Sequence, residues 1–509
     1  MLVVPMESSG QDKAYLDEIN TSSCMGLFKE IIIDRTIDGE AILDNVFIIA
    51  ACNPLRGDST IHLQNVKNVW VKPSYYVREL HPTIDYLKWD YGALNDVQEV
   101  EYITAKMNDC TKDQPEAFTS GQLTYFIVES QNRMRQYANK MLANKGVHVL
   151  EAMKCSRSCV SQRDIQRVFD FYKWLFGTYK AFQRYTTTEE QQIRALLVSL
   201  GLVYYLRLQE LDRESYAEFL DIQCRDLLVR CNFTTAFNDE LEWYIERMNL
   251  PPGIAKTRAL KENIFANIAC CQTHTPLIII GEPGTSKTLS FNLVSSTFKG
   301  KSSKNEELKN TVAFHALQPF FYQCSKHTNS VEVENIFKQA IKRQRVFASS
   351  NVPTFCVVFM DEAGLPEERH ESLKVLHYHL DKREVSFVAI TNHALDAAKT
   401  NRAISLYRPE TSTEDLKILA KDLLRTSTAM TMKSDIINKF CSSFSAMMED
   451  PKYQNFYGQR DFMHFISYIR GKRGAGFLTE DIVLQALERN FNGHENFSEV
   501  FDYFLKVVG

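Results

Sequence analysis

Short runs of uninterrupted apolar residues predict three strands in the second half of the chain. These runs are PLIIIG (276–281), TFCVVFMDE (354–362) and VSFVAITN (385–392). Because none of them alternates apolar with polar positions, we expect each strand to be buried on both faces, as in a parallel sheet covered by helices. Helical periodicity lies between them, as in VEVENIFKQAIKRQRVF (331–347), and this layout indicates an α/β fold.

Helical patterns dominate the region before these strands. Across residues 189–250, apolar residues recur at helical spacing between charges. The most apolar stretch, ALLVSLGLVYYLRL (195–208), is shorter than the roughly 18 residues that cross a bilayer, so we interpret it as a buried helix. Pro251, Pro252 and Gly253 then indicate a boundary before the first predicted strand.

One arrangement of residues occurs twice along the chain. AYLDEINTSS (14–23) is followed by NVFIIAACNP (45–54), and VVFMDEAGLP (357–366) is followed by VSFVAITNHA (385–394). Each copy has an Asp-Glu pair and then an apolar strand that ends in Asn. The sequence therefore predicts two copies of one unit, the first of which lacks its beginning.

A glycine-containing loop follows the first predicted strand and precedes an apolar-patterned helix (287–298). This context is typical of a phosphate-binding loop, in which backbone N–H groups and the helix N-terminus bind phosphate oxygens. Lys287 would neutralise the β- and γ-phosphates of ATP, and the Thr288 hydroxyl would ligate magnesium. Ser286 stands where the usual pattern has glycine, but its side chain is small enough for close approach to phosphate. The expected binding residues are Gly281, Glu282, Pro283, Gly284, Thr285, Ser286, Lys287 and Thr288.

Polar residues at the ends of the next strands supply the remaining chemistry. Asp361 would hold magnesium, and Glu362 beside it suits a general base for the attacking water. Asn392 would orient that water. The alternative for Asp361 and Glu362 is a solvated acidic pair at a strand end, and the alternative for Asn392 is an ordinary turn residue. Arg402 is a candidate arginine finger for a neighbouring unit, and Arg460 a candidate nucleotide contact from a lid. For both arginines the alternative is a plain surface residue.

Composition narrows the class of protein. The 509 residues carry a net charge of −4 with 44% hydrophobic and 24% charged residues, which is ordinary for a multidomain soluble protein. No overall basic field points to nucleic acid. The 12 cysteines are scattered, and CSRSC (155–159) lacks a second ligand pair for zinc. The first residues do not resemble a signal peptide, so we expect a cytoplasmic protein.

The loop, the acidic pair and the strand-end Asn resemble Walker A, Walker B and sensor 1 of AAA+ ATPases. The likeness extends to the mysterin family, giant RING-finger ubiquitin ligases with a dynein-like core of tandem AAA+ units. Five segments look like one such unit: LPPGIAKTRALKENIF, GEPGTSKTLSF, VVFMDEAGLPEE, ITNHALDAAKTNRAI and FYGQRDF. Three earlier segments look like the preceding unit: LDEINTSSCMGLFKEIIIDRTIDG (16–39), FIIAACNPLR (47–56) and LKWDYGAL (87–94).

The resemblance implies an AAA+ P-loop core with a parallel sheet and helical lids. The expected parts are a truncated AAA+ core (1–60), a helical lid and connector (61–250), a complete P-loop core (251–409) and a helical lid (410–509). It implies ATP hydrolysis coupled to ring conformation, with neighbouring AAA+ units and the ubiquitin machinery as partners. It also implies that Ser286 is an ordinary variant of the loop. Members of the family act in the cytosol and at lipid droplets, so the resemblance adds lipid droplets to the expected cellular location.

The departures from the family limit these expectations. The first unit has Asp17, Glu18 and Asn53 but no Walker A loop, so we expect it not to hydrolyse ATP alone. The RING cysteine array is absent, so ligase activity would belong to the full-length family protein. Two alternatives stay open: a nucleotide-gated scaffold with negligible turnover, and a dynein-class motor. No long heptad pair supports the motor.

Overall fold

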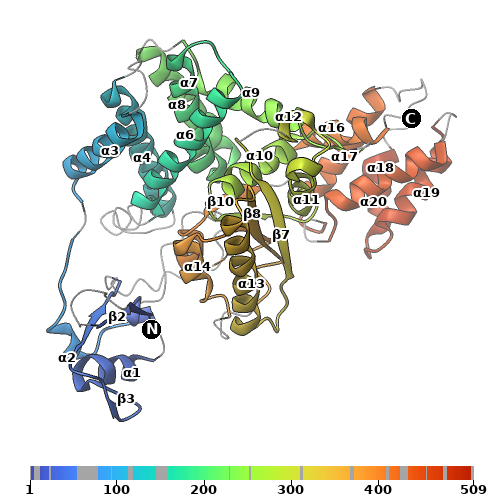
Figure 1. The fold of residues 1–509 in the computed structure, drawn as a ribbon. Coiled ribbons are helices and arrows are strands. Elements are labelled where there is room, and N and C mark those ends of the chain that lie inside the picture. The colour runs from blue at the N-terminus through green and yellow to red at the C-terminus, as the bar shows by residue number, and fades with distance from the viewer. Residues whose placement is uncertain are drawn as a thin grey trace.

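Figure 1 shows the computed structural model, in which a small N-terminal unit, a central sheet with helices against it, and a group of C-terminal helices follow one another. The structure describes residues 2–4, 12–21, 24–53, 78–92, 94–112, 119–144, 159–227, 230–251, 254–309, 313–366, 372–393, 395, 397–408, 412–424, 434–453, 456–473 and 478–505.

The central sheet has five parallel strands in the order β10-β6-β9-β8-β7. The three predicted strands are confirmed, whereas β7 and β10 were not predicted. Both are edge strands, and β7 carries Pro319, which an edge strand tolerates. The strands are β6 (Leu277–Gly281), β7 (Ala316–Gln323), β8 (Thr354–Asp361), β9 (Ser386–Thr391) and β10 (Ile404–Arg408).

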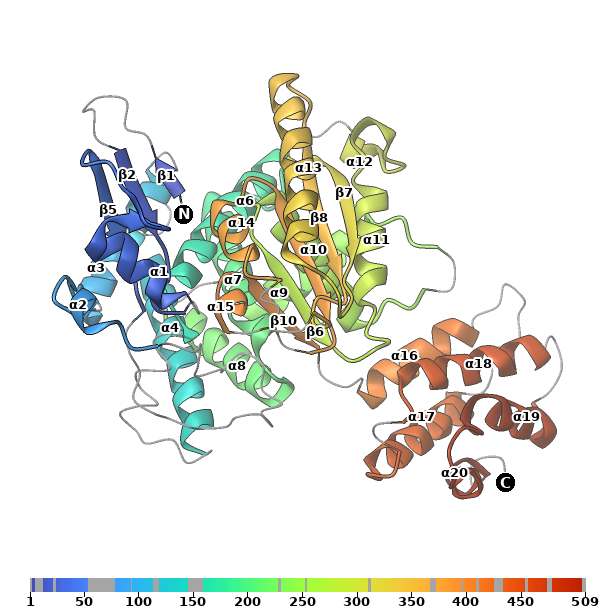
Figure 2. The same cartoon turned by 90° about the horizontal axis from the view of Figure 1, so that it is seen from below.

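Both faces of this sheet are covered, which is why its inner strands are continuously apolar. In β6, Leu277 and Ile279 join one hydrophobic core, and Ile278 and Ile280 join another on the opposite face. Figure 2 shows helices on either side of the sheet. These helices are α10 (Arg258–Gln272), α11 (Lys287–Thr297), α12 (Glu306–Lys309), α13 (Ser330–Ser349), α14 (Leu376–Lys382) and α15 (Ala397–Thr400), with a short 3₁₀ helix, η4 (Gly300–Ser302).

The helices that precede the sheet share its core. One cluster of buried side chains runs from Ile103 through the helices to Leu406 in β10. The apolar stretch 195–208 is a buried helical segment, as predicted. Our division at residue 250 stays a prediction, but packing does not stop there. The elements are α3 (Asp96–Thr111), α4 (Ser120–Ala143), α6 (Gln162–Ala181), α7 (Thr188–Val203), η3 (Tyr205–Arg207), α8 (Glu210–Asp226) and α9 (Phe233–Glu246).

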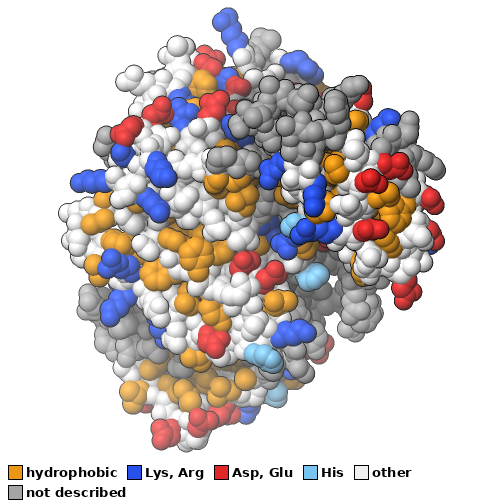
Figure 3. All heavy atoms as spheres, turned by 90° about the vertical axis from the view of Figure 1, so that its right-hand side faces the viewer, with side chains coloured by type: hydrophobic (Ala, Val, Ile, Leu, Met, Phe, Trp, Pro, Cys, Tyr) orange, Lys and Arg blue, Asp and Glu red, His pale blue; other side chains and the backbone are white. Residues whose placement is uncertain are grey.

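The C-terminal helices have a core of their own, from Leu416 to Phe504. Figure 2 shows them beside the sheet. Over the face in Figure 3, basic and acidic side chains are interspersed among hydrophobic ones. The helices are α16 (Thr413–Leu424), α17 (Ser434–Glu449), α18 (Gln459–Arg473), α19 (Glu480–Phe491) and α20 (Phe497–Leu505).

The N-terminal unit contains a three-stranded sheet in the order β1-β2-β5. β2 and β5 are parallel, and β1 pairs with β2 in the antiparallel sense. The elements are β1 (Leu2–Val4), β2 (Asp12–Leu16), η1 (Ile19–Thr21), α1 (Met25–Lys29), the π-helix η2 (Glu30–Asp34), β3 (Thr36–Ile37), β4 (Glu40–Ala41), β5 (Val46–Ala50) and α2 (Pro82–Asp85).

Three kinds of feature are absent from the described ranges: a membrane-spanning helix, a metal-binding cluster and a coiled-coil stalk. Within them, no helix is long and apolar enough to cross a membrane. The same ranges hold no group of His, Cys, Asp and Glu side chains suited to a metal ion. The CSRSC segment lies outside them except for Cys159, which is buried. No pair of helices among the described ones forms a long antiparallel coiled coil of the dynein-stalk kind.

Candidate functional site

The predicted phosphate-binding loop turns sharply from β6 into α11. Gly281 has no room for a side chain, because a Cβ there would lie 2.5 Å from Cβ of Arg408. Gly284 has a φ of +98°. Ser286, the residue that replaces the usual glycine, has φ 58° and ψ 25°. This left-handed conformation costs a residue with a side chain about 1–2 kcal/mol, which explains why glycine is the common choice.

The first turn of α11 offers a site for phosphate. No side chain caps this turn, although helix N-termini are normally capped by a side-chain oxygen. Its uncapped N–H groups and the positive end of the helix dipole suit phosphate oxygens. The loop therefore fits the triphosphate of a nucleotide.

Lys287 lies folded into this loop. Its Nζ donates to the carbonyl oxygens of Gly281 (2.7 Å) and Glu282 (2.9 Å) and to Oδ1 of Asn392 (3.1 Å). The side chain is 7% exposed, and this burial lowers the pKa of Lys287 to about 8. The nearby charge of Arg460 lowers that pKa further, whereas Glu362 raises it. The ammonium group is thus held inside the loop, where a bound phosphate would stabilise its charge.

The strand-end residues converge on the same point. Asp361 ends β8, and its Oδ2 accepts a hydrogen bond from Thr288 Oγ1 at 3.4 Å. Two oxygen ligands of this kind suit magnesium, which prefers carboxylate and hydroxyl oxygens. Asn392 Nδ2 donates to Glu362 Oε2 at 3.2 Å, while Oδ1 of the same amide accepts from Lys287. The amide of Asn392 therefore links the loop lysine to the candidate general base.

The backbone around Glu362 is tightly held. Glu362 has a φ of 53°, and its N–H donates to Oδ1 of Asp361 at 2.9 Å. The next amide, of Ala363, donates to the carbonyl of Ile390 at 2.9 Å. A Cβ on Gly364 would lie 2.4 Å from Thr391 Oγ1. This turn fixes the carboxylate against the end of β9.

Arg460 reaches the loop from the C-terminal helices. It lies in the first turn of α18, and its Cγ would be 3.5 Å from a Cβ on Gly284. Gln459 is equally close, with its Cβ 3.3 Å from the same point. The loop, both strand ends and this arginine therefore come together, and their chemical roles stay predictions.

Arg402 lies elsewhere, against the N-terminal unit. Its Nη2 donates to Oε1 of Glu18 at 2.8 Å, and its Nε donates to Oδ2 of Asp381 at 2.9 Å. The side chain is almost fully buried. Glu18 is the glutamate of the first acidic pair, so Arg402 points at the counterpart of Glu362 in the other unit. This geometry agrees with a residue that acts on a neighbouring unit.

The acidic pair of the N-terminal unit (Asp17 and Glu18) has the same backbone arrangement as the pair Asp361 and Glu362. Glu18 has a φ of 50°, and the amide of Ile19 donates to the carbonyl of Ala51 at 3.0 Å. Asn53 differs from its counterpart. Its N–H and C=O bond the side chain of Asn20 at 2.9 and 2.7 Å.

A buried charged cluster beneath the loop escaped the sequence analysis. Glu262 of α10 accepts from Arg408 (2.5 Å), Arg213 (3.1 Å) and Arg258 (3.0 Å). Burial raises the pKa of Glu262, but the three guanidinium groups outweigh it and hold that pKa at about 2. Arg408 also packs over Gly281, so the cluster ties β10 to the start of the loop. The only local signal is the i,i+4 spacing of Arg258 and Glu262.

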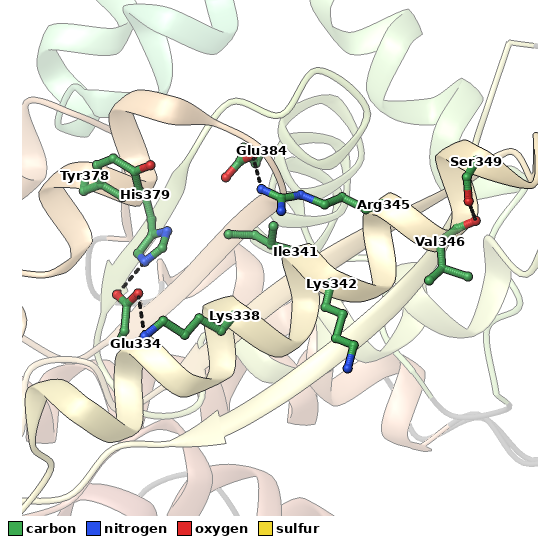
Figure 4. Close-up of a pocket in the computed structure, with 10 residues that line it drawn as sticks. All are labelled: Glu334, Lys338, Ile341, Lys342, Arg345, Val346, Ser349, Tyr378, His379 and Glu384. Carbon is green, nitrogen blue, oxygen red and sulfur yellow. Dashed lines mark hydrogen bonds and ion pairs between the residues drawn. The ribbon is translucent and has the colours of Figure 1, made fainter. Parts of the chain in front are cut away.

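A groove lies away from this site, between α13 and α14. Its volume is about 750 Å³, and Figure 4 shows that charged side chains make up half of its lining residues. Glu334 bonds His379 (2.8 Å) and Lys338 (3.6 Å), and Arg345 bonds Glu384 (3.2 Å). None of the predicted site residues lines it.

Comparisons with known proteins agree with these observations. Residues 253–415 match a family model described as the RNF213 AAA domain. The chain is 26% identical to the human E3 ubiquitin-protein ligase RNF213 over 96% of its length and 26% identical to zebrafish rnf213-beta over 97%. A Dictyostelium discoideum protein named as an uncharacterized transmembrane protein is 27% identical over 97%. The chain spans about 10% of each of these relatives.

Solved structures give weaker likenesses. RuvB of Thermotoga maritima has a TM-score of 0.32 at 12% identity, covering 50% of this chain and 77% of that one. Rhizobiales Trip13 has a TM-score of 0.27 at 13% identity, covering 45% and 77%. These scores are too low to support an argument, so the fold rests on the strand order and the family model. The α/β AAA+ core is confirmed, and the chain is related to the mysterin, or RNF213, family.

Proposed function

We propose that the loop 281–288 binds ATP with magnesium and that this module hydrolyses it. The observation that carries the proposal is the amide of Asn392, which bonds both Lys287 (3.1 Å) and Glu362 (3.2 Å). A phosphate-binding lysine, a carboxylate and a water-orienting amide thus lie within direct reach of one another. Hydrolysis of the γ-phosphate uses a phosphate-binding lysine together with a group that positions or deprotonates the attacking water.

Each residue would have a distinct task. Lys287 and the N–H groups of α11 bind the β- and γ-phosphates. Magnesium, held by Thr288 and Asp361, would supply charge neutralisation at the phosphate oxygens. Glu362 accepts a proton from the attacking water, and Asn392 orients that water. Arg460 contacts the nucleotide from the C-terminal helices, so that closing and opening of these helices would follow the nucleotide state.

We propose that the module works within a larger mysterin-like protein. Relatives named as E3 ubiquitin-protein ligases support this, and the chain spans about 10% of their length. Ligase chemistry would then reside in other parts of such a protein, in the cytoplasm or at lipid droplets. The task of this chain would be to convert ATP state into ring geometry, with Arg402 acting on the preceding unit.

The first test is ATP binding by the whole chain, measured by calorimetry or with a fluorescent ATP analogue. We expect micromolar binding that Lys287→Ala weakens at least about 100-fold, because a buried charge partner of phosphate is lost. Lys342→Ala, an exposed lysine on α13, is the matched control and should bind as the unmodified chain does. Equal binding by all three proteins would contradict the assignment of the loop.

Phosphate release then separates hydrolysis from the scaffold alternative. Tight binding without turnover would favour a nucleotide-gated scaffold. One observation favours that alternative for the N-terminal unit: its glutamate is already engaged by the second unit.

A further inference from the structure

The carboxylate of Glu18 is held through both of its oxygens by the second unit. Oε1 accepts from Arg402 Nη2 at 2.8 Å, and Oε2 lies 3.2 Å from Nδ1 of His377. The residues are more than 350 positions apart, so this contact defines how the two units meet. Because Nδ1 faces a carboxylate, the imidazole donates its Nδ1–H to Glu18.

Burial and charge make this contact strong. The Arg402 side chain is 4% exposed, against 20% for Glu18 and 19% for His377. The hydrogen bond from His377, with the added charge of Arg402, overcomes partial burial and lowers the pKa of Glu18 to about 2. Glu18 is therefore ionised at neutral pH, and each of its two oxygens already accepts from the second unit.

Helix α14 supplies one of the two groups that bind Glu18 and one carboxylate that holds Arg402. His377 and Asp381 lie one turn apart on α14, and Asp381 accepts from Nε of Arg402 at 2.9 Å. Leu376 and Leu380 of the same helix are buried in the core beneath β8 and β9. A movement at the carboxyl ends of these strands would thus shift α14 as a body, and with it the partners of Glu18.

Helix α6 contacts the residues next to Arg402. Arg167 of α6 is fully buried, and its Nη2 donates to the carbonyl of Asn401 at 2.8 Å. Arg163, also on α6, lies 3.9 Å from Asp381. The charged groups that surround Glu18 are thus Arg402, His377 and Asp381, with the α6 arginines behind them.

We propose that His377 is a positioning residue that clamps Glu18 together with Arg402, and that this clamp links the 281–288 site to the acidic pair of the N-terminal unit. The inference rests on the proposed function of that site. While both of its oxygens accept from Arg402 and His377, Glu18 is a weaker base toward water, and an Arg402 guanidinium held by Glu18 and Asp381 is less available to a phosphate. The clamp therefore weakens Glu18 as a base, and nucleotide at 281–288 moves it through α14.

Amide hydrogen exchange on the whole chain tests the clamp. In His377→Gln we expect the amides of residues 14–21 to exchange about fivefold faster, while those of α10 stay unchanged. Glu18→Gln, which also loses the Arg402 ion pair, should accelerate exchange at least as much, and adding His377→Gln to it should add nothing, because the His377 contact is already lost. His327→Gln, an exposed histidine of the same unit, is the control. Additive effects of the two variants would overturn the clamp.

The link to nucleotide is tested with the non-hydrolysable analogue AMP-PNP. At saturation it should change the exchange of residues 14–21 about threefold in the unmodified chain and leave it unchanged in His377→Gln. A purely structural histidine would not abolish this response. Protection confined to the 281–288 loop would overturn the link. If AMP-PNP does not bind at all, the proposed function fails, and the clamp is judged on the variants alone.

Discussion

The N-terminal unit and the unit that holds the central sheet place their glutamates in the same backbone setting and give them different partners. Glu18 and Glu362 have φ values of 50° and 53°, and the amide that follows each donates to the neighbouring strand at 3.0 and 2.9 Å. Glu362 bonds Asn392 of its own unit, whereas Glu18 bonds Arg402 and His377 of the other. Local sequence thus sets the turn, and tertiary packing decides which residue the carboxylate meets.

The position two residues after each glutamate shows the same division. Asn20 is buried and bonds the backbone of Asn53 through its side chain. Gly364 occupies the matching place and has no room for even a methyl group. One turn is closed by a side chain, and the other by close backbone packing.

The largest effect should come from Glu362→Gln. If the second unit holds the working site, this variant should lower kcat about 100- to 10,000-fold, because the general base is lost while ATP still binds. Phosphate release and ATP binding are measured together. Glu384→Gln, a carboxylate in the α13–α14 groove, should keep the unmodified rate. An unmodified rate in Glu362→Gln would place the base elsewhere and remove the distinction between the units.

The pH dependence of binding sharpens the role of Lys287, which the N-terminal unit lacks. Its pKa in the folded chain is about 8, so ATP affinity should fall about tenfold between about pH 7.5 and about pH 9 as the ammonium group loses its proton. The stability of the fold should change with pH in the opposite direction to the ATP affinity. Because the unfolded chain keeps this proton up to the ordinary pKa of 10.5, the free energy of unfolding should rise from about pH 8 to that value.

Calorimetry across this range measures both quantities. Lys287→Arg keeps its charge at every pH used, so any binding that it retains should not change with pH. A flat profile in the unmodified chain would show that Lys287 is not the group that titrates.

Gly364→Ala tests the close packing that distinguishes the second turn. The added Cβ would lie 2.4 Å from Thr391 Oγ1, and such overpacking costs about 1–3 kcal/mol. Thermal unfolding should show a lower midpoint. Gly471→Ala in α18 is the control, because a Cβ there has nothing within 4 Å, and alanine favours a helix by up to about 1 kcal/mol. Equal midpoints for the two variants would show that the turn can relax.

The smallest effect is expected for Ser286→Gly. Relief of the left-handed conformation is offset in part by the entropy that glycine adds to the unfolded chain, which leaves a gain of about 0.5–1 kcal/mol. Ser296→Gly, in the helical part of α11, should instead destabilise the fold. A loss of stability in both variants would mean that Ser286 stabilises its own unusual conformation.

Sequence reasoning reached the elements whose signal is local. The run LIIIG is β6, and the helix expected at 331–347 is α13, which Asn329 and Glu332 begin with a capping box. The site residues from 281 to 392 follow their strands directly, so the parallel sheet brings them together.

The remainder depends on contacts between distant residues. β7 has one buried residue, Leu317, and its other positions are half-buried or exposed, with polar residues and Pro319 among them, so a search for continuous apolar runs misses it. Nothing around His377 or Arg408 in the sequence indicates Glu18 or Glu262 as a partner. Ion pairs of this kind leave no periodicity, because only the folded chain brings the two members together.

The continuous core from Ile103 to Leu406 has a practical consequence for anyone who wishes to produce this AAA+ module. The family model begins at residue 253, but a recombinant piece cut there would strip α9 from α10 and expose the side chains that it covers. Such a fragment should aggregate, or its thermal unfolding should occur at a lower temperature than that of the whole chain. The smallest piece that folds cooperatively is expected to begin before α3, so the functional motif and the folding unit have different borders.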